Sequence, residues 1–191
     1  MQTDTETFYP KNRREWRKWL EKNHATKQSV WVVMYKKASE KPSISWTDAV
    51  DEAICFGWID SLKKSVDSES SVQFFSRRKP KSAWSKINKD KVEKLTNEGL
   101  ITPAGQTTID IAKQNGSWAL LDEVELLVIP DDLQAAFKRH PGSRDFFMSL
   151  SKSIKKMMLQ WVAFAKLPET RENRINEIAE LAGLGKKPKQ F

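Results

Sequence analysis

The sequence has few of the residues that build disulfides and metal centres. Cys55 is the single cysteine, and His24 and His140 are the only histidines among 191 residues. One cysteine excludes an internal disulfide, and two isolated histidines do not provide the ligand set of a zinc or facial-triad iron site. We therefore expect neither a metal nor a cofactor. Cys55 lies near the end of a predicted helix, where the helix dipole disfavours a thiolate, so we interpret it as a packed side chain.

Long apolar runs and the common nucleotide motifs are also missing. No apolar run reaches the roughly 20 residues that a membrane-spanning helix needs, and the first residues, MQTDTETFYPKNRR, lack the apolar core of a secretory signal. We expect a cytoplasmic protein without a membrane span. There is no Walker loop, no GxGxxG and no GxSxG. Whether the protein catalyses a reaction stays open, and an enzyme would need an unusual constellation with Asp60 as its base.

Positive charge is in excess. The formal net charge is +8, from 33 lysines and arginines against 25 aspartates and glutamates. Such a charge favours acidic partners, either a small anionic ligand or an acidic macromolecule such as a nucleic acid.

The segment 45–88 holds most of the plausible functional chemistry. Ser45 and Asp48 form a capping-box pattern, and Gly57 is a typical helix end. Between them we expect a helix with one apolar face and one solvated face. The apolar face comprises Trp46, Ala49, Val50, Ala53 and Ile54, and the solvated face comprises Thr47, Asp48, Asp51 and Glu52. Two strands follow, at about 58–64 and 72–76.

The rest of the chain predicts an α+β fold. A helix over 10–23 precedes a strand over 29–37, SVWVVMYKK, whose two apolar faces predict a strand that is covered on both sides. The helix starting at Ser45 would be a crossover helix, which gives a small mixed β-sheet with an N-terminal helix and a crossover helix. A mostly helical C-terminal half follows. We expect an α/β lobe with a β-hairpin and basic loop over 1–98 and a helical lobe over 99–191, packed as one compact unit.

The last two helices are expected to form a pair. The spacing predicts that Trp161 is buried against Ile175 and Ile178, and that Thr170 caps the final helix. Arg171 and Arg174 would then lie in the first helical turn, where cations oppose the dipole. Either Glu169 or an acid from another helix compensates them, or they bind an anion or fix the helical lobe to the sheet.

The candidate ligand site is the basic segment 75–88, FSRRKPKSAWSKIN. Ser82 is a suitable cap for the next helix, and helix starts bind anions through free backbone N–H groups. Arginine adds forked donors that suit phosphate or carboxylate. The alternative is a solvated basic loop. The predicted anion-binding residues are Arg77, Arg78, Lys79, Lys81, Ser82, Trp84 and Asn88.

Asp60 is the candidate supporting carboxylate. It shares a strand face with Trp58 and Leu62, because side chains alternate along a strand. A covered carboxylate needs a partner or a raised pKa. Asp60 either forms a structural pair with an arginine at the hairpin end, or it orients an arginine toward a ligand.

Three segments together resemble the YdeI/OmpD-associated family of bacteriocin-protection proteins: CFGWIDS at 55–61, FSRRKPKSAWSKIN at 75–88, and LPETRENRI at 167–175. The likeness runs from the Trp16–Leu20 helix to the final glycines. It implies a link to resistance against bacteriocins and antimicrobial peptides, without implying catalytic residues.

We therefore expect a non-catalytic binding or stress-resistance protein of this type. One alternative is a nucleic-acid-binding module that uses the basic and aromatic residues of 75–88. The other is an enzyme with Asp60 as base.

Overall fold

The computed structural model describes residues 6–191. It divides into two compact units, the first ending at Trp118 and the second spanning Ala119–Phe191. The first unit extends past the boundary expected at residue 98, because helix α4 (Pro103–Gln114) packs against helix α2 (Trp46–Cys55). Each unit has its own fold, and together they give the expected α+β class.

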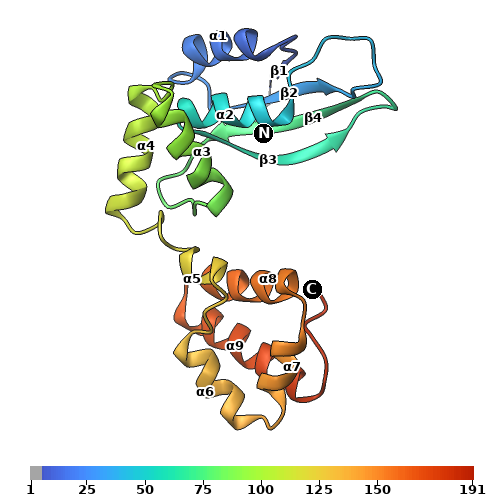
Figure 1. The fold of residues 1–191 in the computed structure, drawn as a ribbon, viewed down its shortest axis with the longest axis vertical. Coiled ribbons are helices and arrows are strands. Elements are labelled where there is room, and N and C mark those ends of the chain that lie inside the picture. The colour runs from blue at the N-terminus through green and yellow to red at the C-terminus, as the bar shows by residue number, and fades with distance from the viewer. Residues whose placement is uncertain (1–5) are drawn as a thin grey trace. The chain divides into compact units, whose positions relative to one another are not determined.

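The first unit contains a four-stranded mixed sheet (Figure 1). Its strands are β1 (Thr7–Phe8), β2 (Ser29–Tyr35), β3 (Trp58–Ser65) and β4 (Ser70–Arg77), in the order β1-β2-β4-β3. β1 is parallel to β2, whereas β4 runs antiparallel to both β2 and β3. β2 and β3 are thus parallel, as a crossover through α2 requires, and β4 lies between them.

Helices α1 (Arg13–Asn23) and α2 cover one face of this sheet (Figure 1). The expected inward residues of α1, Trp16, Trp19 and Leu20, are buried. On α2 the expected face is buried except for its first residue: Ala49, Val50, Ala53 and Ile54 are at most 3% exposed. Trp46, by contrast, is 46% exposed, because it opens the helix and its indole nitrogen donates to Asp60. The prediction that Trp46 is a core residue is wrong.

Two predictions about the strands are also wrong. On β2, Val30, Val32 and Met34 are buried, but Trp31, Val33 and Tyr35 are only half-buried. Their apolar character fits cross-strand pairing with β4 instead of a second covered face. On β3, Trp58, Asp60 and Leu62 were expected to share one face. The strand register shifts between Asp60 and Lys63, and Leu62 is 62% exposed.

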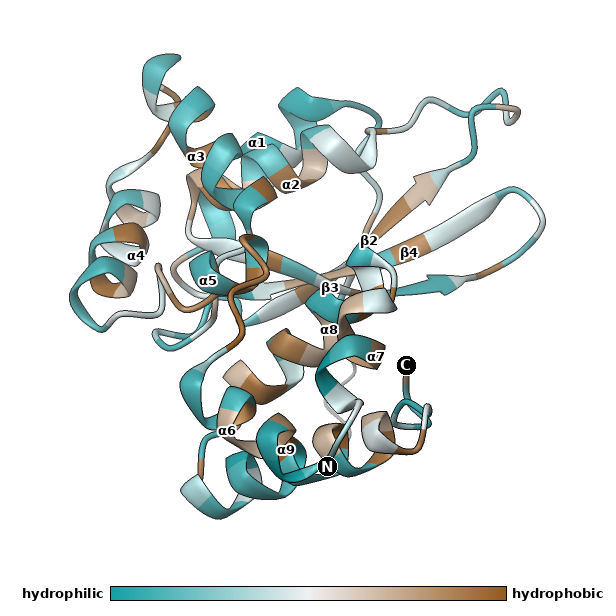
Figure 2. Cartoon of the chain, turned by 60° about the horizontal axis from the view of Figure 1, so that its bottom comes forward, coloured by the Kyte–Doolittle hydropathy of each residue, from teal (hydrophilic) through white to brown (hydrophobic). Residues whose placement is uncertain are grey.

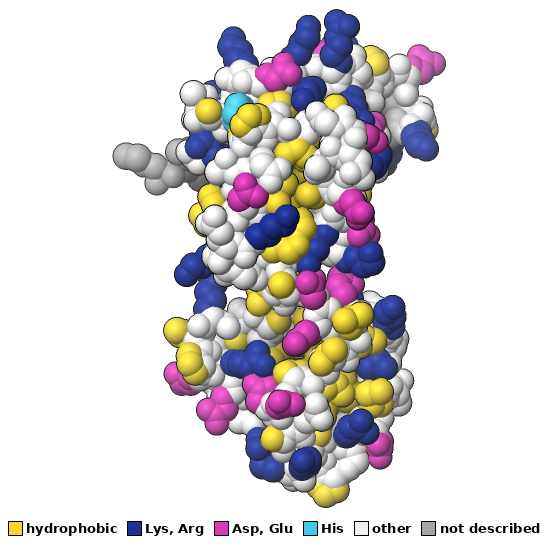
Figure 3. All heavy atoms as spheres, turned by 60° about the vertical axis from the view of Figure 1, so that its left-hand side comes forward, with side chains coloured by type: hydrophobic (Ala, Val, Ile, Leu, Met, Phe, Trp, Pro, Cys, Tyr) yellow, Lys and Arg dark blue, Asp and Glu magenta, His cyan; other side chains and the backbone are white. Residues whose placement is uncertain are grey.

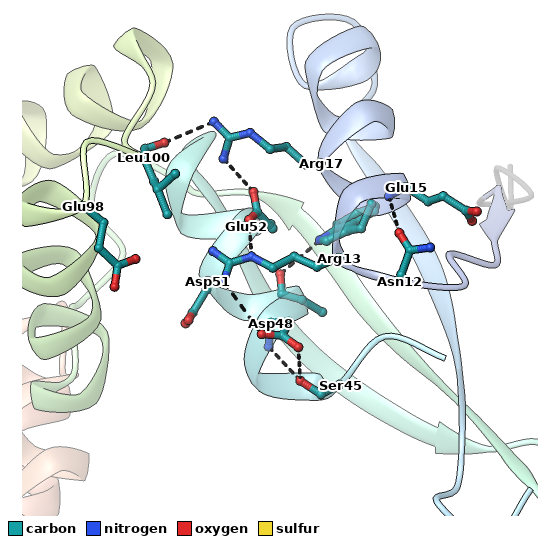
Figure 4. A network of polar contacts seen from close by, with 12 residues as sticks. Asn12, Arg13, Glu15, Arg17, Ser45, Asp48, Asp51, Glu52, Glu98 and Leu100 are labelled. Carbon is teal, nitrogen blue, oxygen red and sulfur yellow. Dashed lines mark hydrogen bonds and ion pairs between the residues drawn. The ribbon is translucent and has the colours of Figure 1, made fainter. Parts of the chain in front are cut away.

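The prediction that Asp51 and Glu52 lie on a solvated face of α2 is wrong, although Thr47 on that face is exposed. Asp51 is 3% exposed and Glu52 is 2% exposed. Figure 4 shows Arg13 and Arg17 of α1 pointing toward Glu52, and the Arg17 Nη1 atom lies 2.8 Å from Glu52 Oε2. Asp51 pairs with Lys91 of α3 (Lys86–Asn97). These residues are buried because helices on both sides supply cations to them.

Two glycines bring α2 and α4 into close contact. Gly57 follows α2 with φ of +73°, which confirms the predicted helix end, and an added Cβ there would lie 2.3 Å from Thr108 Oγ1. At Gly105 of α4 an added Cβ would lie 2.3 Å from the carbonyl oxygen of Cys55. The backbone of α4 can therefore approach the end of α2.

The second unit is helical throughout its regular structure. It contains α5 (Asp122–Glu125), α6 (Asp131–Arg139), α7 (Ser143–Ser149), α8 (Lys152–Ala163) and α9 (Pro168–Gly183). Helix α9 packs against α6, α7 and α8. Hydrophobic and hydrophilic segments alternate along these helices, as expected for helices that each bury one face (Figure 2). Apolar side chains also remain among the charges on the surface (Figure 3).

The terminal helix pair differs from its prediction in two details. Trp161 is half-buried, because it lies at the edge of the unit with Arg174 over its ring and Phe191 against its edge. Helix α9 begins at Pro168 with Leu167 as its N-cap, so Thr170 lies inside the helix and does not cap it. Ile175 and Ile178 are buried as predicted.

The ion pairs around Glu52 give the first testable prediction. We expect Glu52→Gln to lower the free energy of unfolding by about 3 kcal/mol, because it removes the buried carboxylate that both α1 arginines share. Glu98→Gln is the matched control, since Glu98 is 42% exposed and 3.8 Å from Lys94. It should change stability by less than about 0.5 kcal/mol. Urea unfolding at neutral pH measures both, and equal effects would contradict a structural role for Glu52.

Candidate anion-binding site

Arg77 ends β4 opposite Trp58 of β3. Its backbone N–H donates to the Gln28 carbonyl (3.1 Å), and its Nε atom donates to the Lys27 carbonyl (2.8 Å). Its buried Nη2 atom has no acceptor among residues 6–191. The Lys27 carbonyl thus holds the side chain and the Gln28 carbonyl holds the backbone, while the Nη2 donor stays unused.

Arg78 is a buried cation without a bonded carboxylate. It is 7% exposed, its backbone N–H donates to the Gly57 carbonyl, and its Nη1 atom donates to the Ala83 carbonyl (2.9 Å). Its guanidinium carbon lies 3.6 Å from the centroid of the Trp84 ring. Burial lowers the pKa of Arg78 to about 10, and the charge of Asp60 opposes that shift. The stacked indole compensates the buried charge only in part.

Unused donors concentrate around these two arginines. Trp58 and Trp84 are each 1% exposed, and their indole N–H groups have no acceptor among residues 6–191. Arg78 adds Nε and Nη2. Six buried side-chain nitrogens of the described chain lack an acceptor, and five of them belong to Trp58, Arg77, Arg78 and Trp84. Buried polar groups are normally satisfied, so this concentration indicates a missing acceptor.

A pocket of about 350 Å³ opens beside this cluster. The end of α2 and the start of α4 form part of its wall, where Gly57 allows close contact with Thr108. Among residues 6–191, no carboxylate lines it. The lining residues are His24, Ala25, Phe56, Gly57, Trp58, Arg77, Arg78, Ala104, Thr107 and Thr108. The two threonine hydroxyls donate to backbone carbonyls, so the two guanidiniums are the groups that suit an anion.

The downstream part of the predicted site lies elsewhere. Ser85, not Ser82, caps α3 and accepts from the Asn88 N–H, so the first donors of that helix are already partly used. Ser82 forms a turn with the carbonyl of Lys79, and both Lys79 and Lys81 are exposed. None of Lys79, Lys81, Ser82 and Asn88 lines the pocket. The prediction that Ser82 begins the helix is wrong, because the turn after Arg78 delays the helix by three residues.

Trp84 is placed differently from the stacking platform that a nucleic-acid module would use. It is 1% exposed, and Phe75 is fully buried. Trp84 contacts the Trp118 ring at a centroid distance of 5.0 Å and covers Arg78. The 75–88 segment therefore offers no accessible aromatic face at these two positions. Trp84 stacks on Arg78 but does not itself line the pocket.

Asp60 contacts Trp46 instead of an arginine. Its Oδ2 atom accepts from the Trp46 indole nitrogen at 3.2 Å, and no ion pair within 4.0 Å joins it to an arginine in the described chain. The predicted structural Asp–Arg pair is therefore not formed, because the half-buried carboxylate turns toward the start of α2. The negative charge of Asp60 opposes the lowering of the Arg78 pKa that burial causes.

Arg171 and Arg174 belong to the second unit and have partners there. Arg171 donates to both carboxylate oxygens of Asp132, at 2.6 and 3.1 Å, which lowers the pKa of Asp132. Arg174 donates to the Trp161 carbonyl and stacks on the Trp161 ring. The compensating acid for Arg171 is thus one from another helix, as one of the two hypotheses held.

The remaining candidate groups are accounted for separately. Cys55 is fully buried, and desolvation raises its pKa to about 11, which agrees with its interpretation as a packed side chain. Across residues 6–191, no group of three or more His, Cys, Asp or Glu side chains could hold a metal ion.

No helix among the described residues is both long and apolar enough to cross a bilayer.

Two family models match different parts of the chain, and the gap between the two matches contains the boundary between the two structural units. Residues 8–108, a little over half of the chain, match the family described as domain of unknown function DUF8412. The chain belongs to this family. All residues that line the Arg77–Arg78 pocket lie inside the segment that matches this family.

Residues 127–185 match a second family, described as bacteriocin-protection, YdeI or OmpD-associated. This confirms the resemblance for the helical second unit. Two of the three motifs that suggested it, at 55–61 and 75–88, lie within the DUF8412 segment instead. No curated protein and no solved structure matches the chain.

Sequence reasoning found the arginines but missed half of the pocket. Trp58 was expected only in a supporting role, and His24, Thr107 and Thr108 were not expected at all. Thr107 and Thr108 lie in α4 and His24 follows α1, and both helices are distant in sequence from the two arginines. The available signal was Gly57, since a glycine at positive φ allows another backbone or side chain to come close.

The buried, partly unsatisfied state of Arg78 gives the second prediction. Arg78→Met should leave the free energy of unfolding unchanged or raise it by up to about 2 kcal/mol, because it removes a desolvated charge while filling similar space. Urea unfolding in a buffer of low anion content measures this change. A loss of more than about 2 kcal/mol would show that Arg78 is a structural residue and would contradict its assignment to a ligand.

Proposed function

We propose that the DUF8412 unit is a non-catalytic binding module for a small oxyanion, held by Arg77, Arg78 and the indole N–H groups of Trp58 and Trp84. The observation that carries this proposal is the group of five buried donors without an acceptor. A bound phosphate, sulfate or carboxylate would supply oxygen acceptors to these donors. Guanidinium groups bind such oxyanions in a forked geometry.

Binding would also remove the electrostatic cost of Arg78. Desolvation holds its pKa near 10, so burial of this cation destabilises the folded protein. An anion next to the guanidinium would stabilise the charged form. Functional sites commonly retain such locally unfavourable groups, because the ligand compensates for them.

Several observations favour binding over turnover. Among residues 6–191, no carboxylate lines the pocket, and the Thr108 hydroxyl already donates to the Ala104 carbonyl. Asp60, the base in the enzyme hypothesis, lies outside the pocket lining and accepts from Trp46. His24 does line the pocket, with its Nδ1 atom 2.9 Å from the Leu20 carbonyl. The two guanidiniums in the lining suit retention of an anion.

The second unit connects this binding role to a biological setting. Its family is associated with bacteriocin protection. We propose that the protein contributes to such stress resistance through a ligand bound in the first unit, and that it acts in the cytoplasm, as its sequence led us to expect.

A thermal-shift titration tests the binding proposal and gives the third prediction. Phosphate, sulfate and a small carboxylate are added at constant ionic strength, with chloride as the reference. We expect at least one oxyanion to raise the melting temperature saturably, because a ligand that binds only the folded state stabilises it by mass action. Arg78→Met should abolish the rise.

Arg174→Met is the matched control for this titration. Arg174 also stacks on a tryptophan and donates to a backbone carbonyl, but it lies in the second unit. This variant should keep the full response to the oxyanion. If parent, Arg78→Met and Arg174→Met all respond alike, or if no oxyanion acts on the parent protein, the anion-binding proposal is wrong.

A further inference from the structure

A second basic pocket lies at the other end of the sheet. It is formed by the segment 36–45, the start of α2 and Lys63 of β3, and we call it the lysine pocket. We propose that the lysine pocket binds single-stranded nucleic acid, with Trp46 stacking on a base. This site is independent of the Arg77–Arg78 pocket, with which it shares no lining residue.

The lining of the lysine pocket has one sign of charge. Its volume is about 580 Å³, and among the described residues it is lined by four lysines and by no aspartate or glutamate. The lysines are Lys36, Lys37, Lys41 and Lys63, and Ser39, Ser43, Ser45 and Ser71 add hydroxyls. Ser43 donates to the Ile44 carbonyl and Ser45 to Asp48, so the four lysines supply the main contacts for a chain of phosphates.

Trp46 provides an accessible aromatic face within this pocket. It is 46% exposed, and its indole nitrogen is tied to Asp60 at 3.2 Å. The hydrogen bond fixes the edge of the ring and leaves other ring surface in solvent. An exposed aromatic whose orientation is already fixed loses little conformational entropy when a base stacks on it.

The pocket continues onto the half-buried face of the sheet through Tyr35. Tyr35 lines the pocket, carries Lys41 over its ring at 4.7 Å, and contacts the Tyr9 ring at 5.1 Å. Further along the same face, Trp31 pairs with Phe74, and Lys64 lies 4.7 Å from the Trp31 ring centroid. Tyr35 and Trp31 thus add aromatic rings with lysines over them on the face of the sheet opposite the buried Val30, Val32 and Met34.

This arrangement favours a single strand over other acidic partners. A duplex hides its base faces, so it could use the lysines but not Trp46. An acidic protein would use the lysines without requiring a flat ring. Dependence on both Trp46 and the lysines is therefore the property that identifies the partner.

Fluorescence anisotropy with a labelled 12-nucleotide oligothymidine tests this inference on the full chain. We expect binding to weaken with salt, with a slope of log K against log salt near about −3, because each of four phosphate contacts contributes roughly −0.7 on single strands. Trp46→Leu should weaken binding by at least about fivefold. Lys36→Gln with Lys37→Gln should reduce the slope by about 1.4.

Two matched controls accompany these variants. Lys186→Gln with Lys187→Gln removes the same charge from another exposed adjacent pair, and Phe164→Leu removes an aromatic that is 43% exposed in the second unit. Both should leave affinity within about twofold of the parent. Arg78→Met should do the same, so that failure of the oxyanion proposal and failure of this one can be told apart.

Three results would overturn the inference. The first is no binding of the oligonucleotide at low salt. The second is equal weakening by both lysine pairs with no effect of Trp46→Leu, which would show attraction to net charge alone. The third is equal competition by a duplex or by polyglutamate, which would show an acid-binding surface that does not use bases.

Discussion

Two buried carboxylates on α2 hold the first unit together. Glu52 accepts from Arg13 and Arg17 of α1, Asp51 pairs with Lys91 of α3, and the same helix contacts β3 and α4. Because these acids are buried, the helices that carry their cations must stay in place. The position of α2 in turn fixes Gly57, the start of β3 and the approach of α4. The walls of the Arg77–Arg78 pocket depend on these three features.

The contrast between these acids and Arg78 is the basis of the functional argument. All three side chains are almost fully buried, but Asp51 and Glu52 have bonded counter-charges and Arg78 has only a ring face and one carbonyl. The same unit thus satisfies its buried charges in one place and leaves one unsatisfied in another. The proposed oxyanion would account for the difference, because the missing acceptor would come from the ligand.

The sequence predicted those features that depend on local pattern. Helix caps at Ser45, the left-handed Gly57, the apolar faces of α1 and α2, and the strands of the hairpin follow from spacing and turn chemistry. Most of the failures come from contact between segments distant in sequence. Asp51 and Glu52 were expected in solvent because their cations come from other helices, and Trp46 was expected in the core because its partner Asp60 lies on a strand. Ser82 is a local failure, because the turn from Lys79 to Ser82 was not foreseen. At the candidate site the arginines were predictable from charge, whereas Thr107, Thr108 and His24 were not.

The central claim is that one bound oxyanion accepts from the indole N–H groups of Trp58 and Trp84 and from the guanidinium of Arg78. Nitrogen-15 NMR observes these groups directly, because indole and Arg Nε–H signals are resolved from the backbone. On titration with the oxyanion that gives a thermal shift, the account predicts that the signals of Trp58, Trp84 and Arg78 Nε move together with one saturation curve. Those of Trp19 and Trp161 should stay in place. The account would be contradicted if the Trp58 and Trp84 signals did not move with any oxyanion. The same holds if the Arg78 Nε–H signal shifted in the Asp60→Asn variant but not with any oxyanion.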